Sequence, residues 1–223
     1  MATRFYPYGA LTGGAPDVSP TYSGDWGDTS DVLRRKLIID TPGDTGGTVG
    51  YLLENYASPV YYLEWQFVSE PLDAISATLA VAKCAFRCSE DAAKASASLH
   101  VIFRKCDQDG ANPVDIGSIA DGTEFNDTIG IPFNTFAGPS NLTDQAFSQG
   151  DRLIVEVGVY FNNAKSENYY ARIYVNNDHA TTDLPENDTE TAEYNCWIET
   201  GDTFTEASGE PAAIKLGPMF TFA

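Results

Sequence analysis

The sequence predicts an all-β protein, a jelly-roll-like antiparallel β-sandwich, and three observations support this fold class. Apolar and polar residues alternate in several short segments, which is the period of a β-strand. Clusters of Gly, Pro, Asn and Asp separate these segments, and no stretch has the spacing of an amphipathic helix. The chain has 223 residues, of which 43% are hydrophobic, so it can bury one core.

Residues 150–161 contain the clearest strand pattern. Positions 153, 155, 157, 159 and 161 are all apolar and are expected to line the core, whereas positions 152 to 160 of the other parity meet a more mixed environment. A helix here would have to accommodate a β-branched run with a glycine inside it, which is unfavourable. We therefore expect this strand to be the centre of the sandwich.

The remaining segments complete a set of about eight to nine strands. In chain order they are 33–40, 50–55, 61–68, 75–88, 97–106, 114–120, 169–175 and 194–200. In the segment 61–68, alternation predicts Tyr61, Leu63, Trp65 and Phe67 inside and Tyr62, Glu64 and Gln66 outside. Residues 123–139 have no regular pattern, and 214–222 are an apolar run suited to an edge strand or to an arm on a neighbour.

The first 30 residues are rich in Gly, Pro, Tyr, Ser and Asp and show neither the strand period nor the helix period of apolar residues. Two arrangements are open: an extended arm that packs on a neighbouring subunit, or a segment that folds back along its own sandwich. In the first arrangement the partner-binding residues are Arg4, Phe5, Tyr6, Tyr8 and Trp26. The chain then divides into an arm over 1–30, a sandwich over 31–200 and a C-terminal extension over 201–223.

Charge and cysteine content limit the partners and the compartment. With 13 basic and 32 acidic residues the net charge is −19, so nucleic acid and anionic membrane surfaces are not expected partners. No apolar run reaches the roughly 20 residues that cross a bilayer, and the N-terminus lacks a secretory pattern, so synthesis in a cytoplasm is expected. Cys84 and Cys88 could form a Cys-x3-Cys metal pair, but they share parity with Phe86 in a strand-like run, so buried apolar positions are expected for them. No disulfide framework is expected among these two, Cys106 and Cys196.

Few residue patterns favour catalysis. The two histidines, His100 and His179, lie in a strand and in an acidic loop, and no nucleophile elbow, phosphate-binding glycine loop or His-Glu-x-x-His motif occurs. Glu64, Glu156 and Glu199 lie on or beside strands, but no pattern sets two of them across a cleft, as glycoside hydrolysis requires. We therefore expect no enzyme, no catalytic residue, no metal and no cofactor.

Two oxygen-rich stretches and one group of aromatic residues leave alternatives open. The stretch 107–112 begins like a calcium loop, but Pro113 follows it, so a hairpin turn is favoured. The polar loop 176–190 could hold a hard cation, although Asn and Asp also form ordinary turns. Strand tyrosines could stack on sugars, although core and interface positions are the commoner explanation: Tyr61, Tyr62, Tyr160, Tyr169, Tyr170 and Tyr174.

Several stretches resemble a family of phage-encoded virion structural β-sandwich proteins. They are residues 1–6, residues 16–20 with Trp26, residues 63–72, residues 150–158, and residues 182–188 leading to 197–199. The resemblance runs from the N-terminus to about residue 200 and brings no catalytic residue with it. It implies a place in the virion after synthesis in the host cytoplasm, with the major capsid protein or other virion proteins as partners.

The resemblance and the residue patterns together give two expected functions. The first is a head decoration or cement protein, a homo-oligomer with a trimer favoured, that stabilises the particle by burying apolar surface between neighbours. The alternative is a tail-fibre or baseplate-associated adhesin module that binds host glycan on exposed tyrosines. A glycosidase is the third candidate.

Overall fold

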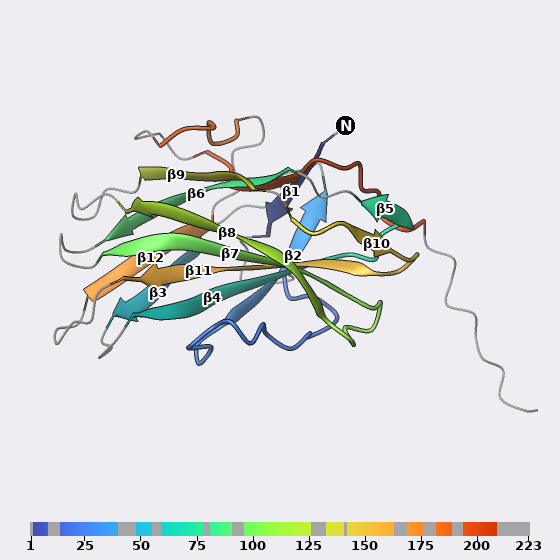
Figure 1. Ribbon diagram of the computed structural model, residues 1–223, viewed down its shortest axis with the longest axis horizontal. Helices are drawn as coiled ribbons and strands as arrows, with labels where there is room; N and C mark the ends of the chain where they lie inside the picture. Colours follow the sequence, from blue (N-terminus) through green and yellow to red (C-terminus); the bar gives the residue numbers. More distant parts are fainter. Residues whose placement is uncertain are drawn as a thin grey trace, which may run out of the picture.

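The protein is an all-β sandwich, as a computed structural model shows, and this confirms the predicted fold class (Figure 1). The structure describes residues 2–8, 14–39, 48–54, 59–77, 81–90, 96–125, 133–140, 142–162, 169–175, 182–188 and 194–208. In this part of the chain no helix is long and apolar enough to cross a membrane.

The described residues contain the following strands. They are β1 Thr3–Pro7, β2 Leu33–Ile39, β3 Thr48–Glu54, β4 Val60–Ser69, β5 Ile75–Ala77, β6 Ala82–Glu90, β7 Ala97–Cys106, β8 Val114–Glu124, β9 Phe133–Ser140, β10 Gln145–Phe147, β11 Arg152–Phe161, β12 Tyr169–Val175 and β13 Trp197–Thr200.

Eleven of these strands belong to one sheet. Its order is β3-β12-β6-β13-β1-β2-β4-β11-β7-β8, with β9 paired to β6, while β5 and β10 form a small separate sheet. The pairs are antiparallel except β2 with β4, which run parallel. One core cluster contains side chains from both halves of the order, so the sheet curls until its two halves face each other.

The prediction for the central strand is confirmed. Leu153, Val155, Val157, Val159 and Phe161 are all fully buried in the main core. They meet large side chains from neighbouring strands and from the facing half of the sheet, among them Trp65, Phe103, Phe86 and Trp197. The opposite face of β11 is covered as well, because the N-terminal segment lies on it.

The alternation expected in 61–68 is correct for Trp65 and Phe67, which lie in the main core. It is wrong for the residues that precede Trp65 in the strand. Tyr62 packs in that core, whereas Leu63 lies on the other face with Trp26. The cause is a bulge: Val157 pairs with Trp65 and Gly158 with Leu63, so the register passes over the residue between them. One extra residue reverses the facing of every side chain before it.

Several other boundaries differ from the expectation, and two of the differences change the assignment of strands. The segment 75–88 is not one strand, since β5 pairs with β10 in the small sheet and β6 belongs to the large one. The irregular region 123–139 contains most of β9, which pairs with β6. The apolar run 214–222 lies outside the described residues.

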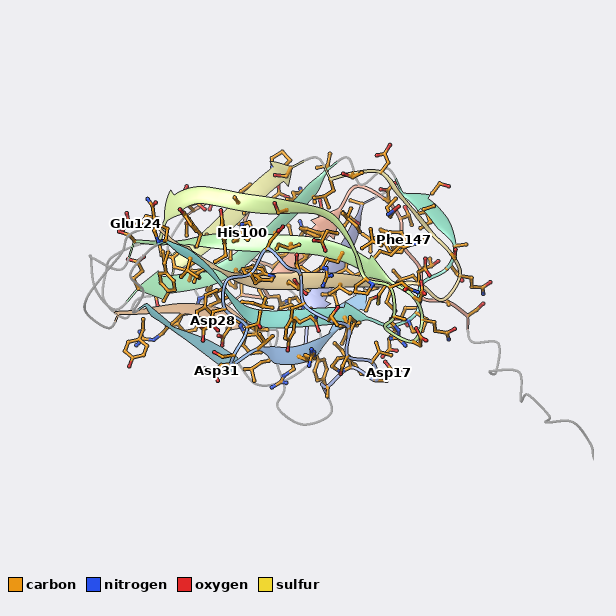
Figure 2. All side chains as sticks on the ribbon, turned by 60° about the horizontal axis from the view of Figure 1, so that its bottom comes forward. Asp17, Asp28, Asp31, His100, Glu124 and Phe147 are labelled. Carbon is orange, nitrogen blue, oxygen red and sulfur yellow. The ribbon has the colours of Figure 1, made fainter. Side chains whose placement is uncertain are left out.

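Of the two arrangements considered for residues 1–30, their described part follows the second and folds back on the sandwich. Strand β1 lies between β13 and β2, with Phe5 opposite both Ile198 and Ile39. Residues 14–32 then cross the outer face of β4, β11 and β7, and Asp17, Asp28 and Asp31 mark their course along one side of the molecule (Figure 2). An intersubunit role for this segment stays a prediction.

Candidate functional site

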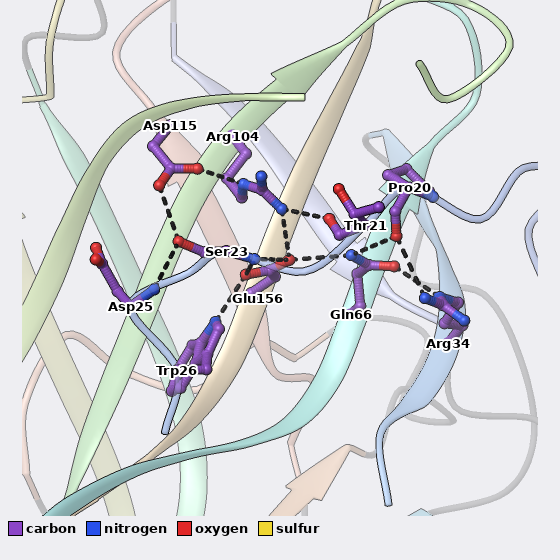
Figure 3. Close-up of polar contacts among 10 residues, drawn as sticks. All are labelled: Pro20, Thr21, Ser23, Asp25, Trp26, Arg34, Gln66, Arg104, Asp115 and Glu156. Atoms are coloured by element: carbon purple, nitrogen blue, oxygen red, sulfur yellow. Dashed lines mark hydrogen bonds and ion pairs between the residues drawn. The ribbon is translucent and has the colours of Figure 1, made fainter. Parts of the chain in front are cut away.

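A buried polar cluster holds the N-terminal segment on the sheet (Figure 3). Glu156 of β11 is fully buried and accepts hydrogen bonds from Trp26 Nε1 at 2.7 Å, Gln66 Nε2 at 3.0 Å and Arg104 Nη1 at 3.1 Å. The backbone N–H of Ser23 also donates to it, at 3.1 Å. Both carboxylate oxygens are therefore engaged with buried donors, which is the arrangement of a structural clamp and not of a general acid.

The rest of the cluster extends the clamp along the segment. Arg104 also donates to Asp115 and to the carbonyl of Thr21, and Gln66 donates to the carbonyl of Pro20 at 3.3 Å. Farther along β11, Arg152 Nη2 donates to Asp17 at 3.0 Å. These contacts fix the segment over nearly its whole described length.

Next to this cluster, a row of aromatic rings lies on the same outer face. The ring of His100 is 5.2 Å from that of Trp26 and 4.5 Å from that of Tyr61, and Tyr61 stacks on Tyr160 at 4.5 Å. Gly158 lies beneath the row, and a Cβ there would come within 2.9 Å of the Trp26 ring. The missing side chain first of all leaves room for the backbone carbonyl of Tyr62 on β4, with which a Cβ would clash, and it also lets the Trp26 ring lie close to the sheet.

A hollow of about 320 Å³ opens at the tyrosine end of this row. Its described lining comes from the ends of β4, β7, β8 and β11: Tyr61, Ser96, Ser98, Leu99, Ala120, Gly122, Glu124, Tyr160 and Asn162. Ser98 is at the centre, because it pairs with Tyr160 on one side and with Glu124 on the other. The register of β8 on β7 shifts here, so β8 bulges around Gly122, where a Cβ would touch nothing.

Few ionisable groups line the described part of the hollow. Glu124 is the only ionisable acid or base, apart from the two tyrosine hydroxyls, among the described lining residues. The nearby His100 is nearly buried, and burial lowers its pKa to about 4, with a smaller opposing effect from Asp25. His100 is therefore uncharged at neutral pH. Aromatic faces beside hydroxyl, amide and carboxylate groups suit a small polar ligand that also has an apolar face.

The five residues expected to bind a partner lie in the chain's own fold and do not line the hollow. Phe5 is fully buried and Trp26 nearly so. Arg4 donates to Glu199 at 2.8 Å and to Asp183 at 2.7 Å, and Tyr6 donates to the same Asp183 at 2.9 Å. Tyr8 is half-buried just after β1. The structure thus brings Arg4 and Tyr6 together and leaves Trp26 in a different cluster.

The three strand carboxylates have separate surroundings. Glu156 is held by Arg104, whereas Glu199 on β13 pairs with Arg4 and with Lys83 at 2.9 Å. Burial raises the pKa of Glu199, but its two cationic partners outweigh this and the net effect is a lowered pKa. Glu64 is buried in β4. Glu156 and Glu199 are thus each paired with different cations, whereas a glycosidase needs two carboxylates that face each other across a cleft.

The stretch 107–112 forms the turn between β7 and β8, as favoured from the sequence. Asn112 donates to Asp107 at 2.8 Å, and the backbone of Ala111 donates to Asp109 at 3.0 Å. Of the polar loop 176–190, residues 182–188 are described, and Asp183 and Glu186 are engaged with basic residues. No cluster of three or more His, Cys, Asp or Glu suited to a metal occurs in the described part of the chain, and His179 lies outside it.

The candidate tyrosines lie in different parts of the structure. Tyr61 and Tyr160 come together at the hollow, Tyr62 is in the core, and the hydroxyl of Tyr174 lies 3.1 Å from that of Ser89. Tyr170 is exposed on β12, and the side chain of Tyr169 lies outside the description. The predicted burial of Cys84 and Cys88 is confirmed, and Cys106 and Cys196 are buried as well.

The sequence did not single out the polar lining of the hollow. Ser96, Ser98, Glu124 and Asn162 are ordinary residues at strand ends, far apart in the chain. The one available signal was topological: antiparallel neighbours bring the start of one strand beside the end of the next. Small polar residues at such ends, next to a strand tyrosine, mark a position where a pocket can form.

Comparisons with known proteins do not identify a family for this chain. No protein-family model matches the chain, and no curated protein matches it. Among solved structures, it is similar to an aminopeptidase from the marine sediment archaeon Thaumarchaeota archaeon, with 11% identity and a TM-score of 0.45 over 76% of this chain and 35% of that one.

Two further structures are similar over part of their length. An α-amino acid ester hydrolase matches with 14% identity and a TM-score of 0.36, over 64% of this chain and 25% of that one. A structure of the infectious bursal disease virus Gx strain matches with 10% identity and a TM-score of 0.28, over 95% of this chain and 64% of that one. The chain thus spans 35% and 25% of the two hydrolases, and likenesses at these scores carry no argument about its activity.

Proposed function

We propose that this chain is a non-catalytic module of a phage virion that binds host glycan, the adhesin alternative of the two functions expected from the sequence. The observation that supports glycan binding is the hollow beside the stacked Tyr61 and Tyr160. The place in the virion rests on the family resemblance described above.

A saccharide fits the chemistry of this hollow. One face of a sugar ring presents C–H groups that pack on an aromatic ring, and its rim presents hydroxyls that need donors and acceptors. Tyr160 offers the ring, while Ser98, Asn162 and Glu124 offer the polar partners. The volume of about 320 Å³ is at the small end for ligand sites, which favours the end of a glycan chain over a large ligand.

Glycan binding by purified protein variants tests the proposal. Tyr160→Ala should weaken binding by about tenfold or more, because it removes the ring against which the sugar packs. Gly122→Phe should do the same by filling the hollow from a position where a new side chain meets no neighbour. The matched control is Tyr170→Ala, which removes an exposed strand tyrosine that does not line the hollow.

Unchanged glycan binding in folded Tyr160→Ala and Gly122→Phe proteins would refute the proposal. Circular dichroism of each variant establishes that the protein is folded. Equal loss of binding in the Tyr170→Ala control would also count against it, because the effect would then not belong to this hollow.

Head decoration remains the second proposed function, because the net charge of −19 suits docking on a basic surface of a neighbouring virion protein such as the major capsid protein. Particles stripped of this protein should rebind it, and occupancy should fall as salt is raised. Rebinding that does not respond to salt would contradict charge-driven docking. Imaging of labelled protein on the particle would distinguish a head location from a tail location.

A further inference from the structure

We propose that the hollow selects its saccharide by charge: Glu124 favours an amine-bearing sugar over a neutral one, and disfavours a sugar with a carboxylate. This inference rests on the proposed glycan function and names the class of ligand for the same site. Three observations support it: the position of Glu124, the lack of a hydrogen-bond or ion-pair partner for its carboxylate among the described residues, and the absence of a cation among the described lining residues.

Glu124 is placed to contact a ligand held at the tyrosines. It is the last residue of β8 and pairs with Ser98, which in turn pairs with Tyr160 on β11. The three side chains therefore form one cross-strand row, since paired residues in neighbouring strands point to the same face. A ring packed on Tyr160 would have its edge toward Ser98 and Glu124.

The carboxylate of Glu124 has no hydrogen-bond or ion-pair partner among the described residues, whereas several other surface acids are paired with a basic side chain. Asp115 is paired with Arg104, Glu70 with Lys36 and Glu186 with Lys83. An exposed carboxylate without a partner keeps its full capacity to accept hydrogen bonds from a ligand.

No positive charge offsets Glu124 in the described lining. It contains no lysine, arginine or histidine. The nearest imidazole identified in the row, His100, is uncharged at neutral pH for the reason given above. The chain as a whole is also strongly acidic, so the field over the hollow is expected to repel anions.

The consequence for a ligand follows from charge pairing. An ammonium group on a sugar can form a charge-assisted hydrogen bond to the Glu124 carboxylate, whereas a neutral hydroxyl forms an ordinary one. A sugar carboxylate at the same position meets a like charge and finds no donor with a positive charge. Ser98 and Asn162 can hydrogen-bond to all three kinds of sugar and do not discriminate between them.

Three matched probes test this selectivity: β-1,4-linked tetrasaccharides of glucosamine, glucose and glucuronic acid. Binding is measured by calorimetry at about pH 6, where the amines are protonated and the carboxylates ionised, and at about 0.15 M salt, which screens the long-range field of the chain. Affinity should fall in that order, by about fivefold at each step, as expected for single charge interactions at a partly exposed site. Glu124→Gln keeps the size of the side chain and removes its charge. In that variant the three affinities should converge to within about twofold.

The possible outcomes separate the two proposals. If the full chain binds all three tetrasaccharides equally, or if Glu124→Gln leaves their order unchanged, charge selection is refuted while glycan binding stands. If Tyr160→Ala binds all three as well as the unmodified chain does, the hollow is not the glycan site and both proposals fail. Both also fail if the unmodified chain binds none of the three.

Discussion

At the scale of single residues, Glu156 shows how the N-terminal segment is attached. It accepts hydrogen bonds from side chains of β4 and β7 and from the segment itself, all in a buried setting. Removing one partner of such a cluster is costly, because the others are left buried without an acceptor.

The change Glu156→Gln should therefore lower the free energy of unfolding by about 3 kcal/mol, because the new amide N–H₂ faces donors where a carboxylate oxygen was. Urea denaturation followed by tryptophan fluorescence measures this. The matched control is Glu124→Gln, an exposed position where the expected change is within about 0.5 kcal/mol. Equal stability of the two variants would mean that the cluster does not hold the segment.

His100 should make the stability of the protein depend on pH. Its pKa is about 4 in the folded protein against 6.5 ordinarily, so between these values the unfolded chain binds the proton and the folded one does not. The stabilising effect is complete above about pH 6.5 and is lost as the pH falls toward 4. Trp26, Tyr61 and the carboxylate of Asp25 are the described groups that act on this imidazole.

Between about pH 7 and about pH 4.5, the protein should lose about 2 kcal/mol more stability than its His100→Leu variant. Carboxylates that titrate in the same range contribute to both proteins and cancel in the comparison. Denaturation curves at the two pH values provide the measurement. Parallel losses in the two proteins would show that His100 titrates normally in the folded state.

At the scale of elements, β1 is part of the core architecture. Phe5 is fully buried, and its ring lies 5.7 Å from that of Phe204. Deletion of residues 2–22 would remove the strand between β13 and β2 and the contact of Asp17 with Arg152. The truncated chain should therefore unfold or aggregate.

Two single substitutions test the structural role of β1 without removing the strand. Phe5→Ala should cost about 3–5 kcal/mol of stability, because it leaves a cavity in the core. Tyr8→Ala, half-buried just after the strand, should cost about 1 kcal/mol. Thermal unfolding of the purified proteins ranks them. If Phe5→Ala left stability intact but lowered the oligomeric state, the segment would be an intersubunit arm after all.

The elements also show what alternation can and cannot predict. Alternation correctly predicted the bounds of β7 and β12 and the inward face of β11, because each of these strands is regularly pleated and has one apolar face. It failed before Trp65, because a bulge is set by the partner strand and leaves no trace in the alternation itself. Strand β1 was missed because its few residues stand among prolines and glycines, which suggested an arm.

At the scale of the whole molecule, the hollow could not be predicted, since its lining comes from four strands that only the sheet order brings together. Two of its residues, Tyr61 and Tyr160, were among six candidate tyrosines, but nothing in the sequence distinguished them from the rest. The burial of Cys84 and Cys88 was predicted, because they share the parity of Phe86 in an apolar strand and free cysteine is usually buried.

The four thiols offer a readout of global unfolding. All are buried, and burial raises the pKa of Cys106 to about 11. Ellman's reagent should therefore react negligibly with the native protein at neutral pH and with all four thiols once denaturant unfolds it. A thiol that reacts rapidly under native conditions would reveal local opening of its part of the sheet.

The pairing of β1 with β13 has a consequence for biosynthesis. Thr3 lies opposite Thr200, so β1 cannot complete its hydrogen bonds until β13, almost 200 residues later in the chain, has been synthesised. Until then the nascent chain exposes an unpaired, aromatic strand edge, and contacts so distant along the chain form slowly. The interval before β13 pairs with β1 is therefore the stage of folding at which this edge is open to wrong contacts, and chaperones would matter most then.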